Sequence, residues 1–460
     1  MPTLDWIGKD KVINHHKDVP YKVLERKYSF DEGGMHKEDI HSNNMIIHGD
    51  NLEALKSLLP QYEGKIKCIY IDPPYNTGNE GWIYNDNVND PKIKKWLGEV
   101  VGKEGEDLSR HDKWLCMMYP RLVLLQKLLA EDGAIFISID DNEHANLLLV
   151  CNEIFGSNNF IQDIIWNKRV SPARDAKFFS TDHEYILVYS KNKESLTTHF
   201  LPRTEKNNSY YKNPDNDPRG PWNSAAYTCN KSRDERPNLY YPITNPYTGE
   251  KIFPKESAVW AYSEETYQQH VRDNLLYWGV NGEAKQPRKK AFLSEVGDVV
   301  PRSVWSHSDV GSTQKATMEN NTIFNMRAFS YPKVSTLVER IIQIASDKDS
   351  IVLDSFAGSG TTAHAVLNMN KSDGGNRKFI LVEMGDYADT ITAERVKRVI
   401  NGYGEGKNAV EGTGGNFSYY ELGNSLFMQD GTINDEVDIT EVRKYVWYTE
   451  TNGIEYKEDI

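Results

Sequence analysis

Short apolar runs alternate with segments of helical spacing in two separate parts of the chain. In the helical segments the apolar residues recur every three or four positions, and the apolar runs have the length of buried strands. Such alternation predicts a parallel sheet with helices on both faces, that is, a doubly wound α/β fold of the Rossmann-like class. The predicted strands are 45–49, 66–71, 134–139, 351–354 and 379–383, and the predicted helices are 50–59, 114–129, 335–344, 361–369 and 389–399.

The region between these two parts has a different character. From about Pro172 to Met326, prolines, asparagines and aromatic residues are frequent and the periodicity weakens, which predicts an inserted domain of mixed structure. The two halves of the α/β sheet are then expected to assemble into one domain. The expected divisions are an N-terminal extension (1–41), a first half (42–170), the inserted domain (171–325), a second half (326–402) and a C-terminal appendage (403–460).

The composition is that of a globular protein, with 460 residues, 38% hydrophobic and 26% charged. This length predicts two or three compact units. No stretch approaches the ~18 apolar residues of a membrane span, and Met1–Asp10 lacks the pattern of a signal peptide. The four cysteines are scattered, which predicts reduced thiols in a cytoplasmic protein and no metal site.

The distribution of charge modifies the conclusion that the net charge suggests. A net charge of −13 argues against a nucleic acid as partner. Between Trp166 and Ser330, however, 23 Lys and Arg stand against 19 Asp and Glu, a local balance of +4, so the remainder carries −17. This asymmetry indicates that one segment faces a polyanion.

The first motif with chemical content is Ile351–Thr362. A strand ends at Asp354, Gly358 and Gly360 allow a tight turn close to a ligand, and a helix is predicted to begin near Thr361. The loop lacks the Gly-Lys-Ser/Thr ending of a phosphate-binding loop, which disfavours a nucleotide-dependent translocase. Taken alone, this motif is equally compatible with a structural glycine-rich turn. Glu383 ends the next strand, where a carboxylate can accept hydrogen bonds from a ribose.

The second motif is Asp72-Pro73-Pro74-Tyr75, which directly follows a fully apolar strand. The two prolines end the strand and remove two N–H donors, so that backbone carbonyls are free to accept hydrogen bonds. Asp72 is a further acceptor, and Tyr75 offers a ring for stacking. These groups suit a planar base that carries an amino group. The alternative is a strand-ending turn with a packed tyrosine.

Together the two motifs resemble those of the amino-methyltransferases of DNA. In that family an Asp-Pro-Pro-Tyr loop carries catalysis and a Phe-x-Gly-x-Gly loop binds S-adenosylmethionine; here the second loop is Phe356-Ala357-Gly358-Ser359-Gly360. The catalytic loop precedes the cofactor loop, as in the circularly permuted β-type members. Segments 47–53 and 72–78 are similar to the modification (Mod) subunits of type III restriction–modification systems, and Tyr331-Pro332-Lys333 is similar to the segment that leads into the cofactor strand.

The resemblance implies methyl transfer from S-adenosylmethionine to the N6 amine of an adenine flipped out of DNA. Asp72 and the carbonyl of Pro73 would accept the hydrogens of the amine, and Tyr75 would stack on the base. Asp50 would approach the adenine edge of the cofactor, or alternatively cap the following helix in a capping box with Glu53. The implied catalytic residues are Asp72, Pro73, Pro74 and Tyr75, and the implied cofactor-binding residues are Asp50, Lys333 (alternatively a solvated lysine), Asp354, Phe356, Ala357, Gly358, Ser359, Gly360, Thr361 and Glu383.

The inserted domain is expected to recognise the target in double-stranded DNA. The resemblance also implies a homodimer and a possible restriction subunit as partner. Alternatives are methylation of the N4 amine of cytosine, which the initial Asp rather than Ser disfavours, and a non-catalytic DNA-recognition subunit. An RNA or protein amide is less favoured as substrate because of the large insertion. Basic clusters that would contact phosphates are Lys168-Arg169, Lys231, Arg233, Arg236 and Arg288-Lys289-Lys290.

Overall fold

The computed structural model describes residues 3–77, 95, 110–428 and 430–451. The chain forms two compact units. One, the large unit, consists of Met1–His199 and Arg302–Ile460, and the other, the small unit, is Phe200–Pro301.

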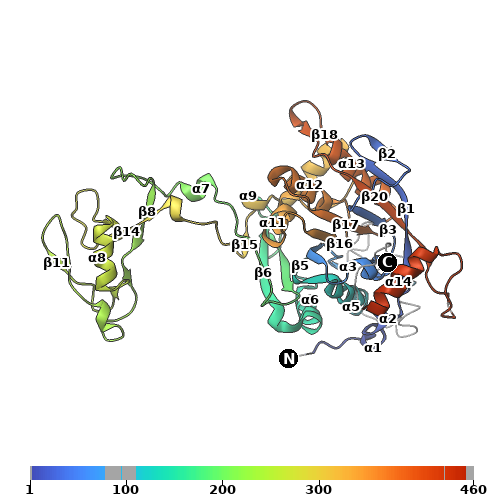
Figure 1. The fold of residues 1–460 in the computed structure, drawn as a ribbon, viewed down its shortest axis with the longest axis horizontal. Coiled ribbons are helices and arrows are strands. Elements are labelled where there is room, and N and C mark those ends of the chain that lie inside the picture. The colour runs from blue at the N-terminus through green and yellow to red at the C-terminus, as the bar shows by residue number, and fades with distance from the viewer. Residues whose placement is uncertain (1–2, 78–94, 96–109, 429, 452–460) are drawn as a thin grey trace. The chain divides into compact units, whose positions relative to one another are not determined.

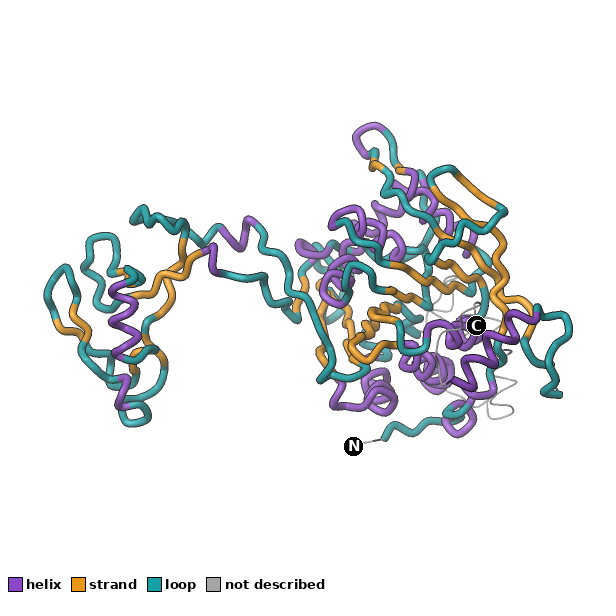
Figure 2. The backbone as a smooth tube through the Cα atoms, viewed as in Figure 1, coloured by secondary structure: helices purple, strands orange, loops and turns teal. Residues whose placement is uncertain are grey.

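The large unit is built on one 11-stranded sheet, whose strands lie side by side in Figure 2. Its six central strands, in the order β5-β4-β16-β17-β3-β20, are all parallel. Antiparallel pairing occurs only towards the two edges, in β5-β7-β6 and in β20-β1-β2. The strands are β1 (Lys22–Asp31), β2 (Gly34–His36), β3 (Met45–His48), β4 (Ile66–Ile71), β5 (Leu129–Ile139), β6 (Phe160–Asn167), β7 (His183–Ser190), β15 (Val304–Trp305), β16 (Ile351–Asp354), β17 (Lys378–Glu383) and β20 (Phe417–Ser425).

Helices cover both faces of this sheet, as a doubly wound fold requires. Figure 1 shows α3, α5 and α6 on one side of the strands and α11, α12 and α13 on the other. The predicted fold class is therefore confirmed. The main helices are α3 (Asn51–Tyr62), α5 (Arg110–Leu128), α6 (His144–Cys151), α10 (Thr313–Phe324), α11 (Ser335–Ala345), α12 (Thr361–Asp373), α13 (Glu394–Asn401) and α14 (Ile439–Thr451), and the shorter ones are α1 (Lys9–Val12), α2 (His15–Asp18) and α9 (His307–Val310).

The two halves of the predicted sheet join at β4 and β16. All six residues of β4 are buried, which fits a strand that has neighbours on both edges and helices on both faces. Val352 of β16 pairs in parallel with Cys68 of β4, and Leu353 pairs with Ile69. Segments that are almost 300 residues apart in the sequence are therefore neighbours at the centre of the core.

Segments near both ends of the chain contribute strands to this sheet: β1 and β2 lie within the predicted extension 1–41, and β20 lies within the predicted appendage 403–460. Strand β20 lies between β3 and β1, parallel to one and antiparallel to the other. Tyr28 stacks on Tyr419 across the β1–β20 pair, with ring centroids 5.0 Å apart. Both β1 and β20 are only partly buried, so their sequences show little alternation of apolar and polar residues. Pairing with strands that are distant in the sequence stabilises them.

The small unit is narrower than the inserted domain predicted at 171–325. Residues before Phe200 include β7, which pairs with β5 and β6, and residues after Pro301 include β15, so both flanks belong to the main sheet. The small unit has its own aromatic core, in which Tyr227, Trp260 and Trp278 are buried. Its elements are α7 (Glu205–Asn208), β8 (Trp222–Ala226), β9 (Thr228–Cys229), β10 (Ile243–Thr244), β11 (Lys251–Ile252), β12 (Val259–Trp260), α8 (Glu264–Arg272), β13 (Leu276–Tyr277) and β14 (Arg288–Phe292).

Within the described ranges, no helix is both long enough and apolar enough to span a membrane.

Candidate active site

The Asp72–Tyr75 segment leaves the sheet at the carboxyl end of β4. Pro73 and Pro74 cannot continue a paired strand, so the backbone turns away after Ile71. The buried indole of Trp114, on α5, donates a hydrogen bond of 2.7 Å to the carbonyl of Pro74. This bond fixes the backbone of the turn against a helix of the core.

Asp354 and Glu383 end the two neighbouring strands at the same edge of the sheet. The carboxylate of Asp354 accepts hydrogen bonds from the backbone N–H of Phe356 (3.0 Å) and the hydroxyl of Thr362 (2.6 Å). Glu383 accepts from the N–H groups of Gly358 (2.7 Å) and Gly385 (2.8 Å). Both carboxylates therefore shape the glycine-rich loop that begins after Asp354.

The glycine-rich loop needs glycine at position 360 for two reasons. Its φ of +81° lies in the left-handed region, and a Cβ there would lie 2.9 Å from the carbonyl oxygen of Thr392. The hydroxyl of Thr392 in turn donates to the carbonyl of Gly358 at 2.6 Å. On the other side of the loop, the buried guanidinium of Arg395 donates to the hydroxyls of Ser359 and Thr361, both at 2.9 Å. The loop is thus held from two sides.

The two motifs line one cavity of about 270 Å³. Asp72–Tyr75 forms one part of its wall and the loop from Asp354 to Thr362 forms another, although the motifs are 282 residues apart in the sequence. The cavity wall thus contains most residues of the two predicted motifs, whereas the predicted cofactor residues Asp50, Gly360 and Glu383 are not among the residues that line it. Further lining residues are Tyr70, Thr77, Asp140, Lys168, Glu184, Phe329, Ser330, Tyr331, Pro332 and Lys333.

A cluster of charged groups surrounds Asp72 in this cavity. The ammonium of Lys333 lies 2.9 Å from the Asp72 carboxylate, 3.3 Å from that of Glu184 and 2.8 Å from the hydroxyl of Tyr75. Tyr75 is within hydrogen-bonding distance of both carboxylates, and Lys168 pairs with Glu184 at 2.8 Å. Two carboxylates and two ammonium groups therefore balance in charge.

Burial and pairing act in opposite directions on the protonation of this cluster. Burial raises the pKa of the Asp72 carboxyl, and the nearby Lys333 offsets only part of that effect. For Lys333, burial would lower the pKa, but Asp72 and Glu184 raise it above its ordinary value. For Glu184, burial would raise the pKa, but Lys333 and Lys168 bring it below the ordinary value. Lys333 is therefore held as a cation.

Burial also raises the pKa of Asp354, to about 7. The hydroxyl of Thr362 and the N–H of Phe356 favour the ionised form of this carboxyl, but they do not compensate for the loss of water. The pKa of Glu383 is raised for the same main reason. Asp354 lines the cavity, and Glu383 lies against the glycine-rich loop, where it accepts from the N–H of Gly358.

Asp50 and Lys333 are two predicted cofactor residues whose contacts within the protein bear on the alternatives given for them, and only Lys333 lines the cavity. Asp50 caps α3, accepting a hydrogen bond of 2.7 Å from the N–H of Leu52, so the capping alternative holds. Its partner is Leu52 rather than Glu53, so the predicted capping box does not form. Lys333 is only 10% exposed, which corrects the alternative of a solvated lysine.

The predicted DNA contacts fall into two groups. Lys290 is 2% exposed and pairs with Asp215 (2.5 Å) and Asp217 (2.8 Å), which corrects its assignment as a phosphate contact, because its charge is already neutralised inside the small unit. Lys168 lies in the cavity wall rather than on an outer surface. The cations that lie at least partly exposed are Arg169, Lys231, Arg233, Arg236, Arg288 and Lys289.

The sequence did not point to Glu184 as a residue of the site. It lies at the start of β7, and β7 runs antiparallel to β5, so its first residues lie at the same sheet edge as the ends of the parallel strands. A charged residue in an otherwise apolar strand was the available signal. Its meaning depended on the direction of β7, which a local pattern does not contain.

A family model and individual relatives were compared with this chain, and they agree on one family. The model of the DNA methylase family matches residues 66–394. The chain is 34% identical over 424 residues to the type III restriction-modification enzyme StyLTI Mod subunit of Salmonella typhimurium, covering 86% of this chain and 62% of that protein. It is 33% identical to the type II methyltransferase M.KpnI of Klebsiella pneumoniae, covering 74% of this chain and 81% of that protein.

Among solved structures, the PvuII DNA methyltransferase (cytosine-N4-specific) superimposes with a TM-score of 0.41 at 14% identity, covering 76% of this chain and 86% of that one. The chain spans about three fifths of the length of the StyLTI Mod subunit, and a similar share of the EcoPI Mod subunit of Escherichia phage P1.

Proposed function

Because this chain belongs to the DNA methylase family, we propose that it transfers a methyl group from S-adenosylmethionine to the N6 amine of adenine in DNA. The observation that carries the proposal is the single cavity lined by both Asp72–Tyr75 and the loop from Asp354 to Thr362. A methyl transferase must bring a donor and an acceptor to within reacting distance. A cavity with one distinct motif on each side meets that requirement.

The lining of the cavity fits S-adenosylmethionine, which combines a sulfonium cation with an adenosine and an amino acid. Aromatic rings from Phe329 and Phe356 offer apolar and π surfaces, and Asp354 places a carboxyl group in the same wall. Glu383 accepts hydrogen bonds from the N–H groups of Gly358 and Gly385, so it lies directly against the glycine-rich loop, and we assign it to the hydroxyls of the ribose. When bound, the cofactor supplies a methyl group that the sulfonium already activates.

Asp72 would receive the amine of the target base. Its carboxylate accepts hydrogen bonds from Lys333 and Tyr75. Because the same carboxylate lines the cavity, it can also accept a hydrogen bond from a molecule bound there. An entering amine can take the place of Lys333, because Glu184 lies 3.3 Å from the same ammonium and can retain it. The carbonyl of Pro73 is the second acceptor.

These hydrogen bonds favour a tetrahedral nitrogen whose lone pair faces the methyl group. They strengthen as positive charge develops on the nitrogen, so they stabilise the transition state more than the ground state. The nitrogen would bond to the methyl carbon as the carbon–sulfur bond breaks and the sulfur leaves as a neutral thioether, and the nitrogen would then release one proton. Asp72 is suited to accept that proton because burial raises its pKa.

Tyr75 would stack on the base after it leaves the duplex. Its ring already packs against a cation, with the Lys333 ammonium 4.8 Å from the ring centroid. Stacking offsets part of the few kcal/mol that base extrusion costs. The exposed cations of the small unit, such as Arg233 and Arg236, would contact DNA phosphates and position the duplex.

The choice of adenine follows from Asp72, since the resembling family carries Asp for adenine and Ser for cytosine. The relatives named as type III Mod subunits support a role in restriction–modification. On that basis we further propose a homodimer and a restriction subunit as partner. Size determination by light scattering tests the dimer, which a monomer at micromolar concentration would contradict.

The proposal is tested by transfer of labelled methyl groups to DNA. We expect the Asp72→Ala variant to lose transfer by about 100-fold or more, because it lacks the acceptor for the amine. Its affinity for S-adenosylmethionine, measured by calorimetry, should stay close to that of the unchanged protein. The control is Asp10→Ala, which removes a side chain that is 74% exposed and remote in sequence from both motifs. Unchanged turnover in Asp72→Ala contradicts the assignment.

A further inference from the structure

The loop between β6 and β7 exposes two adjacent phenylalanines. Phe178 is 83% exposed and Phe179 is 92% exposed, the highest value among the large apolar side chains of the described residues. Two neighbouring aromatic side chains in water forgo the favourable free energy that burial would provide. Their exposure contributes nothing to the fold, which indicates a surface used for contact.

The base of this loop is part of the cavity wall. Lys168 and Glu184 stand at the two sides of the loop, both line the cavity, and they form an ion pair of 2.8 Å. The N–H of Lys168 also donates to the carbonyl of Asp182 at 2.8 Å, which closes the loop at its base. The loop therefore begins at the cavity wall, so a long molecule such as duplex DNA can reach both the cavity and the loop.

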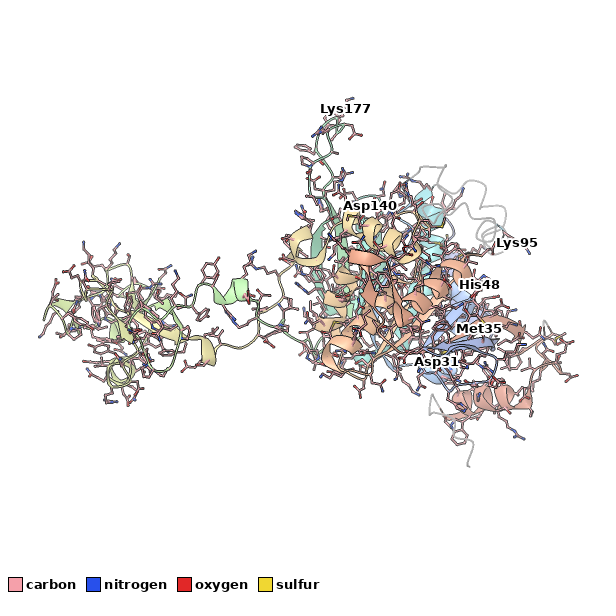
Figure 3. The ribbon with its side chains drawn as sticks, turned by 90° about the horizontal axis from the view of Figure 1, so that it is seen from above. Asp31, Met35, His48, Lys95, Asp140 and Lys177 are labelled. Atoms are coloured by element: carbon pink, nitrogen blue, oxygen red, sulfur yellow. The ribbon has the colours of Figure 1, made fainter. Side chains whose placement is uncertain are left out.

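The loop is also braced and extended above that base. The N–H of Ala173 donates to the hydroxyl of Ser180 at 2.6 Å, so the two sides are joined a second time before the tip. Figure 3 shows Lys177 at the far end of a segment that projects away from the sheet and helices of the large unit. The phenylalanines directly follow Lys177 and thus lie in the projecting part.

The charges around the phenylalanines favour a polyanion. Arg169, Arg174 and Lys177 are all exposed, against a single acid, Asp175, between them. The ammonium of Lys177 lies 5.3 Å from the centroid of the Phe178 ring. Cations beside exposed aromatic rings are the combination by which proteins contact the phosphates and the base stack of a nucleic acid.

We propose that Phe178 and Phe179 enter the base stack of duplex DNA next to the base that occupies the cavity. The inference rests on the proposed function, since it assumes that a base leaves the duplex. Removing a base leaves a gap, and an apolar wedge in that gap offsets the lost stacking. The cations of the loop hold the phosphates on either side.

The test compares two DNA duplexes that carry the adenine methylated in genomic DNA. In one the adenine is paired, and in the other it lies opposite an abasic position, so that little energy is needed to extrude it. The variant is Phe178→Ala/Phe179→Ala. We expect kcat/KM for the paired duplex to fall roughly 10- to 100-fold, and most of that loss to disappear on the abasic duplex.

The control is Met35→Ala, which removes an apolar side chain that is 60% exposed on β2, at the opposite edge of the sheet. It should leave kcat/KM unchanged on both duplexes. Activity of the double variant within twofold of the unchanged protein on the paired duplex overturns the inference, as does an equal loss on both duplexes.

The test also has to distinguish duplex DNA from a second copy of the chain as the partner that the two phenylalanines contact. Sedimentation without DNA should give the same mass for the double variant and the unchanged protein; a lower mass for the variant overturns the inference, because the phenylalanines then lie between copies. If the unchanged protein methylates neither duplex, the proposed function fails rather than this inference.

Discussion

Lys333 illustrates how neighbouring groups decide the role of a single residue. Its position before the cofactor strand resembles that of a residue that would meet the methionine carboxylate, but its ammonium lies against Asp72, Glu184 and Tyr75. It thereby favours the ionised form of both carboxylates, against the effect of their burial. Movement of this one cation away from Asp72 would expose the acceptor that the amine needs.

Asp354 gives a prediction at this scale, because its folded-state pKa of about 7 lies above the value of 3.8 for a free carboxyl. Between about pH 4 and 7 the folded protein binds one proton more than the unfolded chain, so this group lowers the stability as pH rises through that range. Asp354→Asn removes the titration; its amide oxygen can accept from the N–H of Phe356, and its NH2 group can donate to the hydroxyl of Thr362. The Tm of the variant minus that of the unchanged protein should therefore be larger at pH 8 than at pH 5.

The exposed Glu411, 88% exposed, supplies the control for this experiment. Glu411→Gln should shift the Tm by a small amount that does not follow the pattern of Asp354→Asn. A Tm difference for Asp354→Asn that is the same at pH 5 and pH 8 contradicts the raised pKa.

At the scale of elements, the connection from β16 to α12 depends on a close approach of two backbone segments. In Gly360→Ala the new Cβ would lie 2.9 Å from the carbonyl of Thr392, in addition to the strain of a positive φ. Gly374, at the other end of α12, has a φ of +67°, but a Cβ at that position would meet no atom within 4 Å. A comparison of Gly360→Ala with Gly374→Ala therefore separates the cost of the backbone conformation from the cost of the steric clash.

We expect Gly374→Ala to lower the free energy of unfolding by about 1 to 2 kcal/mol, the cost of the left-handed conformation alone. Gly360→Ala should lower it further and should also weaken the binding of S-adenosylmethionine, measured by calorimetry. Equal losses in the two variants, with equal cofactor affinity, would show that the contact with Thr392 carries no energy.

The elements also show what a sequence pattern can predict. Strand β4 was predicted with the bounds that the structure has, and β16 likewise, because a strand buried on both faces is a continuous apolar run with a clear end. Strand β1 was missed, since its residues are mostly half-exposed and their pattern is weak. Its pairing with β20 involves residues almost 400 positions away, and no local window contains that contact.

The same limit applies to the site. Asp72 and Gly358 can be predicted because each belongs to a compact sequence motif. Glu184 and Lys168 line the cavity only because of the direction of β7 and the position of the loop before it, and both are properties of the tertiary structure.

For the whole molecule, the sheet explains how two motifs in a permuted order come to line one cavity. The parallel strands present their carboxyl ends at one edge, so the loops after β4, β16 and β17 meet there whatever their order along the chain. The small unit is inserted between β7 and β15 and folds around its own aromatic core. The main sheet and the inserted small unit each have a core of their own, so their sequences can vary separately.

The most direct test of the central claim is to map modified bases in genomic DNA from cells that express this protein. We predict N6-methyladenine at one recurring sequence, and its absence when the cells express Asp72→Ala instead. Genomic DNA that carries N4-methylcytosine, or no new modified base, would contradict the claim.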